Sequence, residues 1–182
     1  MNGESSYRRF INGDNTAIGE IVTLYNKSLV FYLTGILGSV SLAEDAAADA
    51  FVKLLVKKPR LKDGTALRTY LYRIGRNCAL DMLRSLSRCG ELSLDEGAEP
   101  ADSLSLEAEL LKDERDRCLH SAMASLKAEY RQVLHLLYFE EMDYKSAGKT
   151  MGKTVKQITN LAYRAKAALR TKLEEKGFDY EI

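Results

Sequence analysis

The residues best suited to chemistry lie between Asp143 and Arg170, where amide and cationic side chains collect on one side of an expected helix. Gln and Asn can form paired hydrogen bonds with an adenine edge, whereas Arg and Lys can bind guanine edges or phosphates. The pattern therefore predicts a helix that reads DNA, and the alternative is a solvated basic helix of an all-helical domain. The residues expected to make this contact are Lys153, Thr154, Lys156, Gln157, Asn160 and Arg164.

A helix-turn-helix would position these side chains. Asp143 can cap a short first helix, Gly152 supplies the left-handed residue on which such a helix ends, and Thr154 can cap the second helix. In this motif the second helix enters the major groove of DNA. Apolar residues that recur three and four positions apart give this helix a core-facing stripe, formed by Ile158, Leu161, Ala162, Ala165 and Leu169.

Charge is distributed in blocks along the 182 residues, although the net charge is only +1. From Lys53 to Arg88 the chain is strongly basic, from Glu91 to Arg117 it is mainly acidic, and after Met142 it is basic again. Two basic blocks separated by an acidic one predict two anion-binding surfaces joined by a segment that DNA repels.

Several other classes of site are not indicated by the sequence. The longest uncharged window, residues 28–43, is too short to span a membrane, and the polar N-terminus does not resemble a secretory signal, so we expect no membrane insertion and a cytoplasmic protein. Cys78, Cys89 and Cys118 lack the spacing of a disulfide framework or a zinc site. His120 and His135 are expected to pack or to lie at the surface. We therefore expect no metal and no cofactor.

The first half of the chain predicts three helices after an irregular start of about ten residues. The first two helices are expected to end near Gly38 and Pro59, because glycine commonly closes a helix and proline disfavours a helical residue before it. A polar, basic loop precedes the third helix. The expected capping residues are Asp14 or Asn15, then Ser41 paired with Glu44, and finally Thr65.

A composition rich in Ser, Glu, Asp and Gly marks residues 89–105 as a flexible acidic linker. Helical periodicity returns from Leu106 to Met123, and Ser125 is expected to cap the next helix. No alternating run typical of a strand is present. The sequence therefore predicts an all-α protein of two small helical bundles, with domains at residues 1–88 and 106–182, the second containing the helix-turn-helix.

Two stretches of the first half and one of the second resemble a known family. The segments AEDAAADAFVKL and LRTYLYRIGRNCALDMLR, together with the closing AYRAKAALR, are similar to the motifs of extracytoplasmic-function RNA polymerase sigma factors, a subfamily of the sigma-70 family. The resemblance covers roughly residues 16–88 and 106–174. It implies a sigma factor that binds core RNA polymerase, directs it to specific promoters and assists promoter melting, with an anti-sigma factor as a further partner.

The resemblance also implies roles for individual residues. The first bundle would bind the polymerase through Asp45, Ala48, Asp49 and Lys53. The second bundle would read the minus-35 promoter element through the six residues named above. Melting DNA requires stacking surfaces and cations along the separated strand. Contacts with the minus-10 element would come from Lys62, Asp63, Thr65, Arg68, Tyr70, Arg73, Arg76 and Asn77.

Some positions depart from the family pattern and leave alternatives open. Leu67 and Tyr70 stand where Phe and Trp are usual, and Ser146, Ala147 and Gly148 replace Glu-Ile-Ala. A tyrosine on the third helix, Tyr70 or the neighbouring Tyr72, can either face DNA or pack between helices. A stand-alone helix-turn-helix regulator is the alternative function. An enzyme is disfavoured because no phosphate-binding glycine loop, metal-ligand spacing or nucleophile with a nearby base is apparent.

Overall fold

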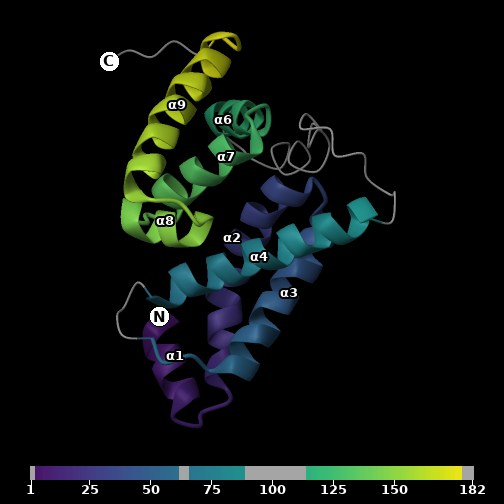
Figure 1. The fold of residues 1–182 in the computed structure, drawn as a ribbon, viewed down its shortest axis with the longest axis vertical. Helices are drawn as coiled ribbons and strands as arrows, with labels where there is room; N and C mark the ends of the chain where they lie inside the picture. Colours follow the sequence, from purple (N-terminus) through teal and green to yellow (C-terminus); the bar gives the residue numbers. More distant parts are fainter. Residues whose placement is uncertain (1–2, 62–65, 89–113, 178–182) are drawn as a thin grey trace.

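The computed structural model describes residues 3–61, 66–88 and 114–177, and these ranges are helical with no strand among them (Figure 1). This confirms the expected all-α class. The helices of the first half are α1 (Gly3–Ile11), α2 (Ala17–Leu37), α3 (Val40–Lys57) and α4 (Ala66–Arg88). Those of the second half are α6 (Glu114–Ala124), α7 (Ala128–Leu134), the π-helical turn η1 (His135–Phe139), α8 (Tyr144–Met151) and α9 (Val155–Glu174).

The first bundle forms where α2, α3 and α4 pack their apolar stripes together. Leu33, Leu54 and Leu71 are completely buried at its centre. The inward face of α3 is apolar, since Ala47, Ala50, Phe51 and Leu54 are buried and Leu55 is partly buried. Burying a leucine side chain contributes roughly 1.5–3 kcal/mol, so this shared core is what holds the three helices together.

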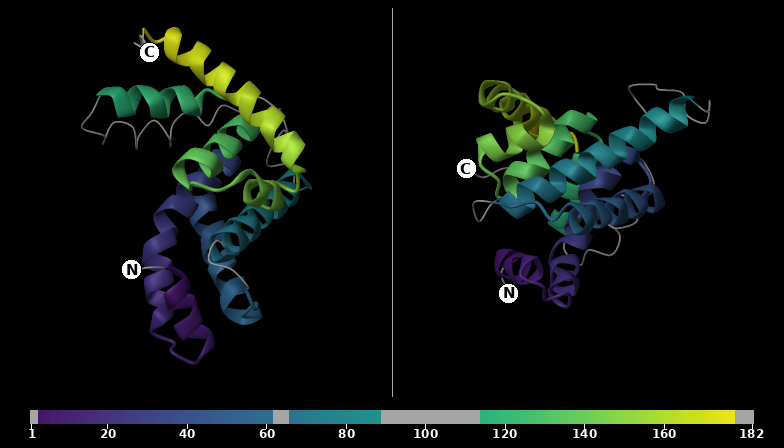
Figure 2. Two further views of the ribbon diagram at one scale, coloured as in Figure 1. Left: turned by 90° about the vertical axis from the view of Figure 1, so that its left-hand side faces the viewer. Right: turned by 60° about the horizontal axis from the view of Figure 1, so that its bottom comes forward.

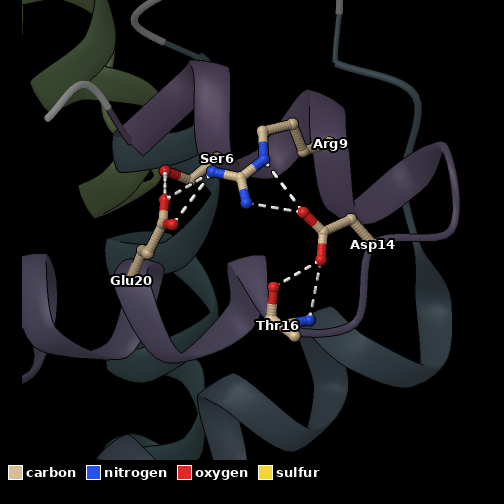
Figure 3. A network of polar contacts seen from close by, with 5 residues as sticks. All are labelled: Ser6, Arg9, Asp14, Thr16 and Glu20. Carbon is tan, nitrogen blue, oxygen red and sulfur yellow. Dashed lines mark hydrogen bonds and ion pairs between the residues drawn. The ribbon is translucent and has the colours of Figure 1, made fainter.

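The N-terminal residues are not an irregular start, because Gly3–Ile11 form α1 and pack against α2. Figure 3 shows the polar contacts that join the two helices. Arg9 lies 2.6 Å from Asp14 and 2.9 Å from Glu20, and Ser6 donates to Glu20 at 2.6 Å. Asp14 in turn accepts from the backbone N–H of Thr16 at 3.0 Å, just before α2 begins. These tertiary contacts stabilise a short helix that periodicity alone did not reveal.

Three of the predicted caps are wrong. Thr16, not Asp14 or Asn15, is the N-cap residue of α2. Ser39, not Ser41 with Glu44, caps α3 and accepts from the N–H of Leu42 at 3.4 Å. Ser125 donates back to the Ala122 carbonyl instead of capping α7. In all three regions several small polar residues lie close together, so the sequence could not choose between neighbouring start points. The expected cap at Thr65 and the expected linker 89–105 lie outside the described residues.

In the second bundle, α7 and α9 pack against each other and α8 closes one end. Its core contains the predicted stripe of α9, with Ile158, Leu161, Ala162 and Ala165 buried. The predicted turn chemistry is also confirmed. Asp143 caps α8, Gly152 ends it with a φ of 67°, and Thr154 caps α9.

The two bundles are in contact, with α8 against α4 and α7 against α2 (Figures 1 and 2). The buried apolar residues of both halves form one continuous cluster. The second bundle, shown in green and yellow, therefore covers one side of α4. Over the parts of the chain that the structure describes, no helix has the length and hydropathy needed to cross a membrane.

Candidate nucleic-acid interface

The N-terminal half of α9 presents the predicted DNA-reading side chains to solvent. Lys156, Gln157, Asn160 and Arg164 are all exposed, whereas Ile158 on the opposite side is fully buried. The helix therefore keeps its core-facing and polar faces separate, as the sequence predicted. A polar face of this width on a second helix matches the geometry by which helix-turn-helix proteins reach base edges.

A capping box fixes the start of α9. Thr154 accepts from the N–H of Gln157 at 3.2 Å, and the Gln157 side-chain oxygen accepts from the N–H of Thr154 at 2.8 Å. These bonds satisfy two backbone donors that would otherwise lack a partner. They also engage the Gln157 oxygen with the protein, which restricts the orientation in which this amide can pair with a base. Asn160 has no such commitment and keeps both amide atoms for a paired contact.

Lys153 and Arg164 occupy different environments on this surface. Lys153 is partly buried and its Nζ lies 3.1 Å from the Glu129 carboxylate on α7, which ties the turn to the rest of the bundle. Arg164 is exposed and its Nε donates to the Asn160 carbonyl of its own helix at 3.4 Å. Arg164 is therefore free to extend toward a phosphate.

The turn before α9 depends on two glycines and one carboxylate. Asp143 accepts from the N–H of Ser146 at 2.6 Å, and this hydrogen bond lowers the pKa of its carboxyl group. A Cβ atom on Gly148 would lie 2.6 Å from the backbone oxygen of Lys153, closer than real Cβ contacts. A side chain larger than that of glycine at position 148 would therefore require the turn to shift.

The predicted minus-10 residues divide between two sides of α4. Arg73 and Asn77 are exposed, and Tyr70 is partly buried with the Arg73 guanidinium 5.5 Å from the centre of its ring. A cation over an aromatic face is a combination that also serves to bind an unpaired base. This side of α4 is open to a nucleic acid. Lys62, Asp63 and Thr65 lie outside the described residues.

The other side of α4 faces the second bundle. Arg68 donates to the backbone carbonyl of Glu140, and its Nε lies 3.8 Å from the carboxylate of the same residue. Arg76 donates through its Nε to the side-chain oxygen of Gln132 at 3.0 Å. Two of the five described minus-10 candidates are therefore engaged with the protein itself.

Tyr72, one of the two tyrosines with two possible roles, packs in the core. It is fully buried, its ring centre lies 5.3 Å from that of Tyr32, and its hydroxyl donates to Ser28 at 2.9 Å. Burial raises the pKa of Tyr72 well above its usual range. The packing interpretation is thus correct for Tyr72, which has no free surface for stacking on a base.

The predicted polymerase-binding residues lie along one side of α3. Asp45, Ala48 and Asp49 are exposed, and Lys53 is partly buried with its Nζ 3.1 Å from the Cys78 sulfur. Sequence reasoning missed two apolar neighbours, since Val52 is 54% exposed and Val56 is 78% exposed on the same helix. Their spacing from Asp45 and Asp49 places them beside the predicted contact, and this spacing is a signal the sequence already carried.

Sequence reasoning also missed the residues through which the two bundles bind each other. Ser28 and Glu140 share a hydrogen bond, and Arg131 donates to the Gly35 carbonyl at 2.9 Å. Arg131 is buried, which lowers its pKa to about 10. None of these residues belongs to a recognisable motif. No cluster of His, Cys, Asp and Glu side chains able to hold a metal occurs within the described ranges.

Each of the two bundles matches the sequence model of a known protein family. The sequence model of Sigma-70 region 2 matches residues 21–89, which contain most of α2 and all of α3 and α4. The model of Sigma-70 region 4 matches residues 116–169, which contain most of α6 and continue into α9. The two matches follow the order of the two bundles and together include the predicted surfaces of α3, α4 and α9.

Individual relatives are similar over nearly the whole chain. The ECF RNA polymerase sigma factor SigW of Bacillus subtilis is 25% identical over 174 residues, covering 90% of this chain and 92% of the relative. The RNA polymerase sigma-H factor of Pseudomonas aeruginosa is 27% identical over 176 residues, covering 91% of each.

Solved structures share the fold. CnrH, in complex with the cytosolic domain of CnrY, matches with a TM-score of 0.65 at 20% identity, covering 93% of this chain and 96% of that chain. The sigma factor RpoE of Bartonella quintana, in complex with the anti-sigma factor NepR, matches with a TM-score of 0.66 at 20% identity, covering 86% of this chain and 96% of that chain.

Proposed function

This chain belongs to the sigma-70 family of RNA polymerase sigma factors, in its extracytoplasmic-function subfamily, and we propose that it binds core RNA polymerase and directs it to specific promoters. In this role it also assists promoter melting. The observation that carries the proposal is the presence of both family regions, in order, on two helical bundles with polar and basic surfaces. A protein that only bound DNA would need the second of these regions alone.

The second bundle is assigned to the minus-35 element. Support comes from the exposed side chains of α9 and from the capped, glycine-dependent turn that holds the helix in place. Asn160 is the strongest candidate for base reading, because its amide is uncommitted. Lys156 and Arg164 supply phosphate contacts, and Lys153, Thr154 and Gln157 shape the start of the helix.

The first bundle is assigned to the polymerase and to the minus-10 element. The exposed side of α3, with Asp45, Ala48, Asp49 and the apolar Val52 and Val56, has the mixed character of a protein-binding surface. On α4, the Tyr70, Arg73 and Asn77 side chains offer a stacking surface and cations to a separated strand. Lys53 completes the proposed polymerase-binding set. The proposed minus-10 set is completed by Arg68 and Arg76, together with Lys62, Asp63 and Thr65.

The remaining expectations follow from the same role. The protein acts in the cytoplasm and performs no catalysis of its own, because the polymerase supplies the chemistry. An anti-sigma factor is a fitting further partner, since the structurally similar sigma factor RpoE forms a complex with the anti-sigma factor NepR. No residue described above identifies the partner of this chain.

Reconstitution tests the proposal. Purified protein is mixed with core RNA polymerase and with fragmented DNA, and the DNA retained by the complex is sequenced. The proposal predicts co-elution with the core enzyme, a shared two-part motif in the retained DNA, and transcription that starts at a fixed distance from it. If the chain binds DNA but never the core enzyme, the stand-alone regulator is the correct function.

A further inference from the structure

We propose that helix α1 positions the minus-10 surface of the first bundle, and that Tyr7 and Phe10 are the residues through which it acts. The inference rests on the proposed promoter contact of α4 and names an element on which that contact depends. The match to Sigma-70 region 2 begins at residue 21, so it does not include α1. Both residues are buried, and they therefore influence DNA binding through the segments that they hold.

The chain leaves α3 through a residue in an unfavourable conformation. Lys58 ends the helix in the left-handed region, with a φ of 40°, and its N–H donates to the Leu54 carbonyl at 3.0 Å. This conformation is costly for a residue with a Cβ atom, and it persists where neighbouring groups hold it. Residues 59–61 follow and lead in the sequence to Lys62, the first of the proposed minus-10 residues. The direction of this segment therefore depends on what holds Lys58 in place.

Two contacts from α1 hold the chain at this point. The Tyr7 hydroxyl donates to the Pro59 carbonyl at 2.7 Å, and the Lys58 ammonium lies 4.8 Å from the centre of the Phe10 ring. In Figure 1 the chain that leaves α3 runs past α1. Proline has no backbone N–H, so its carbonyl is the backbone group through which a hydrogen bond can hold it. Tyr7 and Phe10 thus fix two successive residues, one of them strained.

Helix α1 is itself fixed to α2, so it can serve as a rigid support. Ser6 donates to Glu20 at 2.6 Å, and Arg9 pairs with both Asp14 and Glu20 (Figure 3). Phe10 is only 2% exposed and belongs to the same core as the other helices of the bundle. Movement of α1 relative to α2 would break these contacts.

Tyr7 also lies beside Tyr70, the proposed stacking residue of α4. Helix α1 contacts α4, and burial together with the neighbouring Tyr70 raises the pKa of Tyr7 to about 12. Tyr7 therefore keeps its proton at neutral pH and remains a donor to Pro59. Arg73 in turn lies over the Tyr70 ring. Tyr7 is thus placed between the segment that follows α3 and the exposed side of α4.

Two pairs of variants separate positioning from simple stabilisation. Tyr7→Phe removes the hydroxyl that reaches Pro59 and keeps the ring, and Ser6→Ala is its matched control, because it removes a hydrogen bond between α1 and α2. Lys58→Met removes the cation over Phe10, and Lys57→Met removes the neighbouring exposed charge. Circular dichroism verifies that each full-length variant remains helical.

The first measurement is hydrogen exchange of the Lys58 amide in the free protein. We expect exchange about fivefold faster in Y7F, the factor that corresponds to one neutral hydrogen bond, and about threefold faster in K58M. S6A and K57M should match the wild type at this amide. Equal exchange in Y7F and the wild type would overturn the inference, and equal effects of K57M and K58M would overturn the role of Phe10.

The second measurement is binding of the complex with core polymerase to two DNA probes. One is a single-stranded DNA carrying the minus-10 sequence recovered by reconstitution, and the other is a duplex carrying the minus-35 element. We expect Y7F to bind the single strand about fivefold more weakly and the duplex as tightly as the wild type, because the minus-35 surface lies on the second bundle. S6A should bind both probes normally. A general loss of stability would instead weaken both.

Unchanged binding of the single strand by Y7F, or equal losses for both probes, would overturn the inference while leaving the proposed function intact if the wild type still recognises its promoter. Failure of the wild type to bind core polymerase would overturn the proposed function, and the promoter role of α1 with it. The two failures are therefore distinguished by the behaviour of the wild type.

Discussion

The two helices proposed to contact DNA differ in how freely their polar side chains can act. On α9 the candidate readers Asn160, Lys156 and Arg164 are exposed and the helix start is fixed by its own capping box. On α4, Arg73 is exposed, whereas Arg68 and Arg76 are held by the second bundle. The proposed minus-35 surface on α9 is thus already in place. On α4, part of the proposed minus-10 surface is bonded to the second bundle.

This difference follows from what positions each surface. The α9 surface is built by local chemistry, with caps, a left-handed glycine and a close backbone contact all inside 32 residues, 143–174. The α4 surface depends on tertiary contacts with residues more than fifty positions away, such as Gln132 and Glu140. A surface built locally keeps its shape in isolation, whereas one shaped by a neighbouring bundle changes when that neighbour moves.

The largest effect is expected from Gly148→Ala, which acts on the locally built surface. The added Cβ would lie 2.6 Å from the Lys153 backbone oxygen, so the turn must shift. We expect a loss of about 2–3 kcal/mol in unfolding free energy, as for other overpacked sites, measured by urea denaturation.

A matched substitution in the first bundle gives the control. Gly19→Ala on α2 meets no atom within 4 Å and should increase stability by about 0.5–1 kcal/mol, since alanine favours the helix. If Gly148→Ala were also stabilising, the turn would not depend on close backbone contact, and the account of α9 as a sterically fixed element would be wrong.

A smaller effect, on specificity, is expected from Asn160→Ala. Loss of a paired amide contact should cost about 2 kcal/mol at the one base pair that Asn160 reads and leave the other positions unchanged. Lys156→Ala is the control, because loss of a phosphate contact weakens binding to all sequences and reduces the salt dependence. Binding of the holoenzyme to a library of minus-35 variants measures both. A uniform loss for Asn160→Ala would place it on the backbone instead.

The substitutions Arg73→Ala and Arg76→Ala test the two sides of α4, one exposed to solvent and the other bonded to the second bundle. Arg73→Ala should weaken binding of a random single-stranded DNA to the free protein by about 1 kcal/mol, because this side chain is available. Arg76→Ala should have a smaller effect in the free protein, because its Nε is already bonded to Gln132. Equal losses in the free protein would show that the second bundle does not restrict α4.

The smallest effect concerns acidic pH and the Glu140 contact. Burial alone would raise the pKa of Glu140, but its contacts with His135, Ser28 and Tyr72 outweigh burial and place the pKa below the usual 4.5. The ionised carboxylate therefore stabilises the contact between the two bundles above pH 4.5. This contribution is lost as the pH falls through the lower pKa that Glu140 has in the folded protein. Scattering from about pH 6 to about pH 3 should show expansion that begins below about pH 4.5 and is weaker in Glu140→Gln. Identical expansion in both proteins would exclude Glu140 as its cause.

The sequence predicted those parts of the structure that depend on local rules. The caps Asp143 and Thr154, the turn at Gly152 and the core stripe of α9 were all confirmed, because each depends on neighbouring residues. Helix α1 was missed because tertiary contacts stabilise it: Tyr7 and Phe10 are buried in the core, and Arg9 pairs with Asp14 and Glu20.

The candidate interface could be predicted only in part for the same reason. The basic and aromatic residues of α4 could be read from the sequence. Burial of Tyr72 and the hydrogen bonds of Arg68 and Arg76 could not, because they depend on how α4 packs against α2 and the second bundle. No pattern in the sequence connects Gln132 or Glu140 with an arginine in the other half. The steric reason for Gly148 likewise appears only when the turn backbone is placed above it.

Hydroxyl-radical footprinting of core polymerase bound to this protein, on a promoter recovered from the reconstitution experiment, tests the central claim most directly. We expect two protected regions about 25 base pairs apart, because this is the distance between the minus-10 and minus-35 elements. The upstream region should weaken with Asn160→Ala and the downstream region with Arg73→Ala. A single protected region, or loss of both regions from either substitution, would contradict the assignment of two separate DNA contacts to the two bundles.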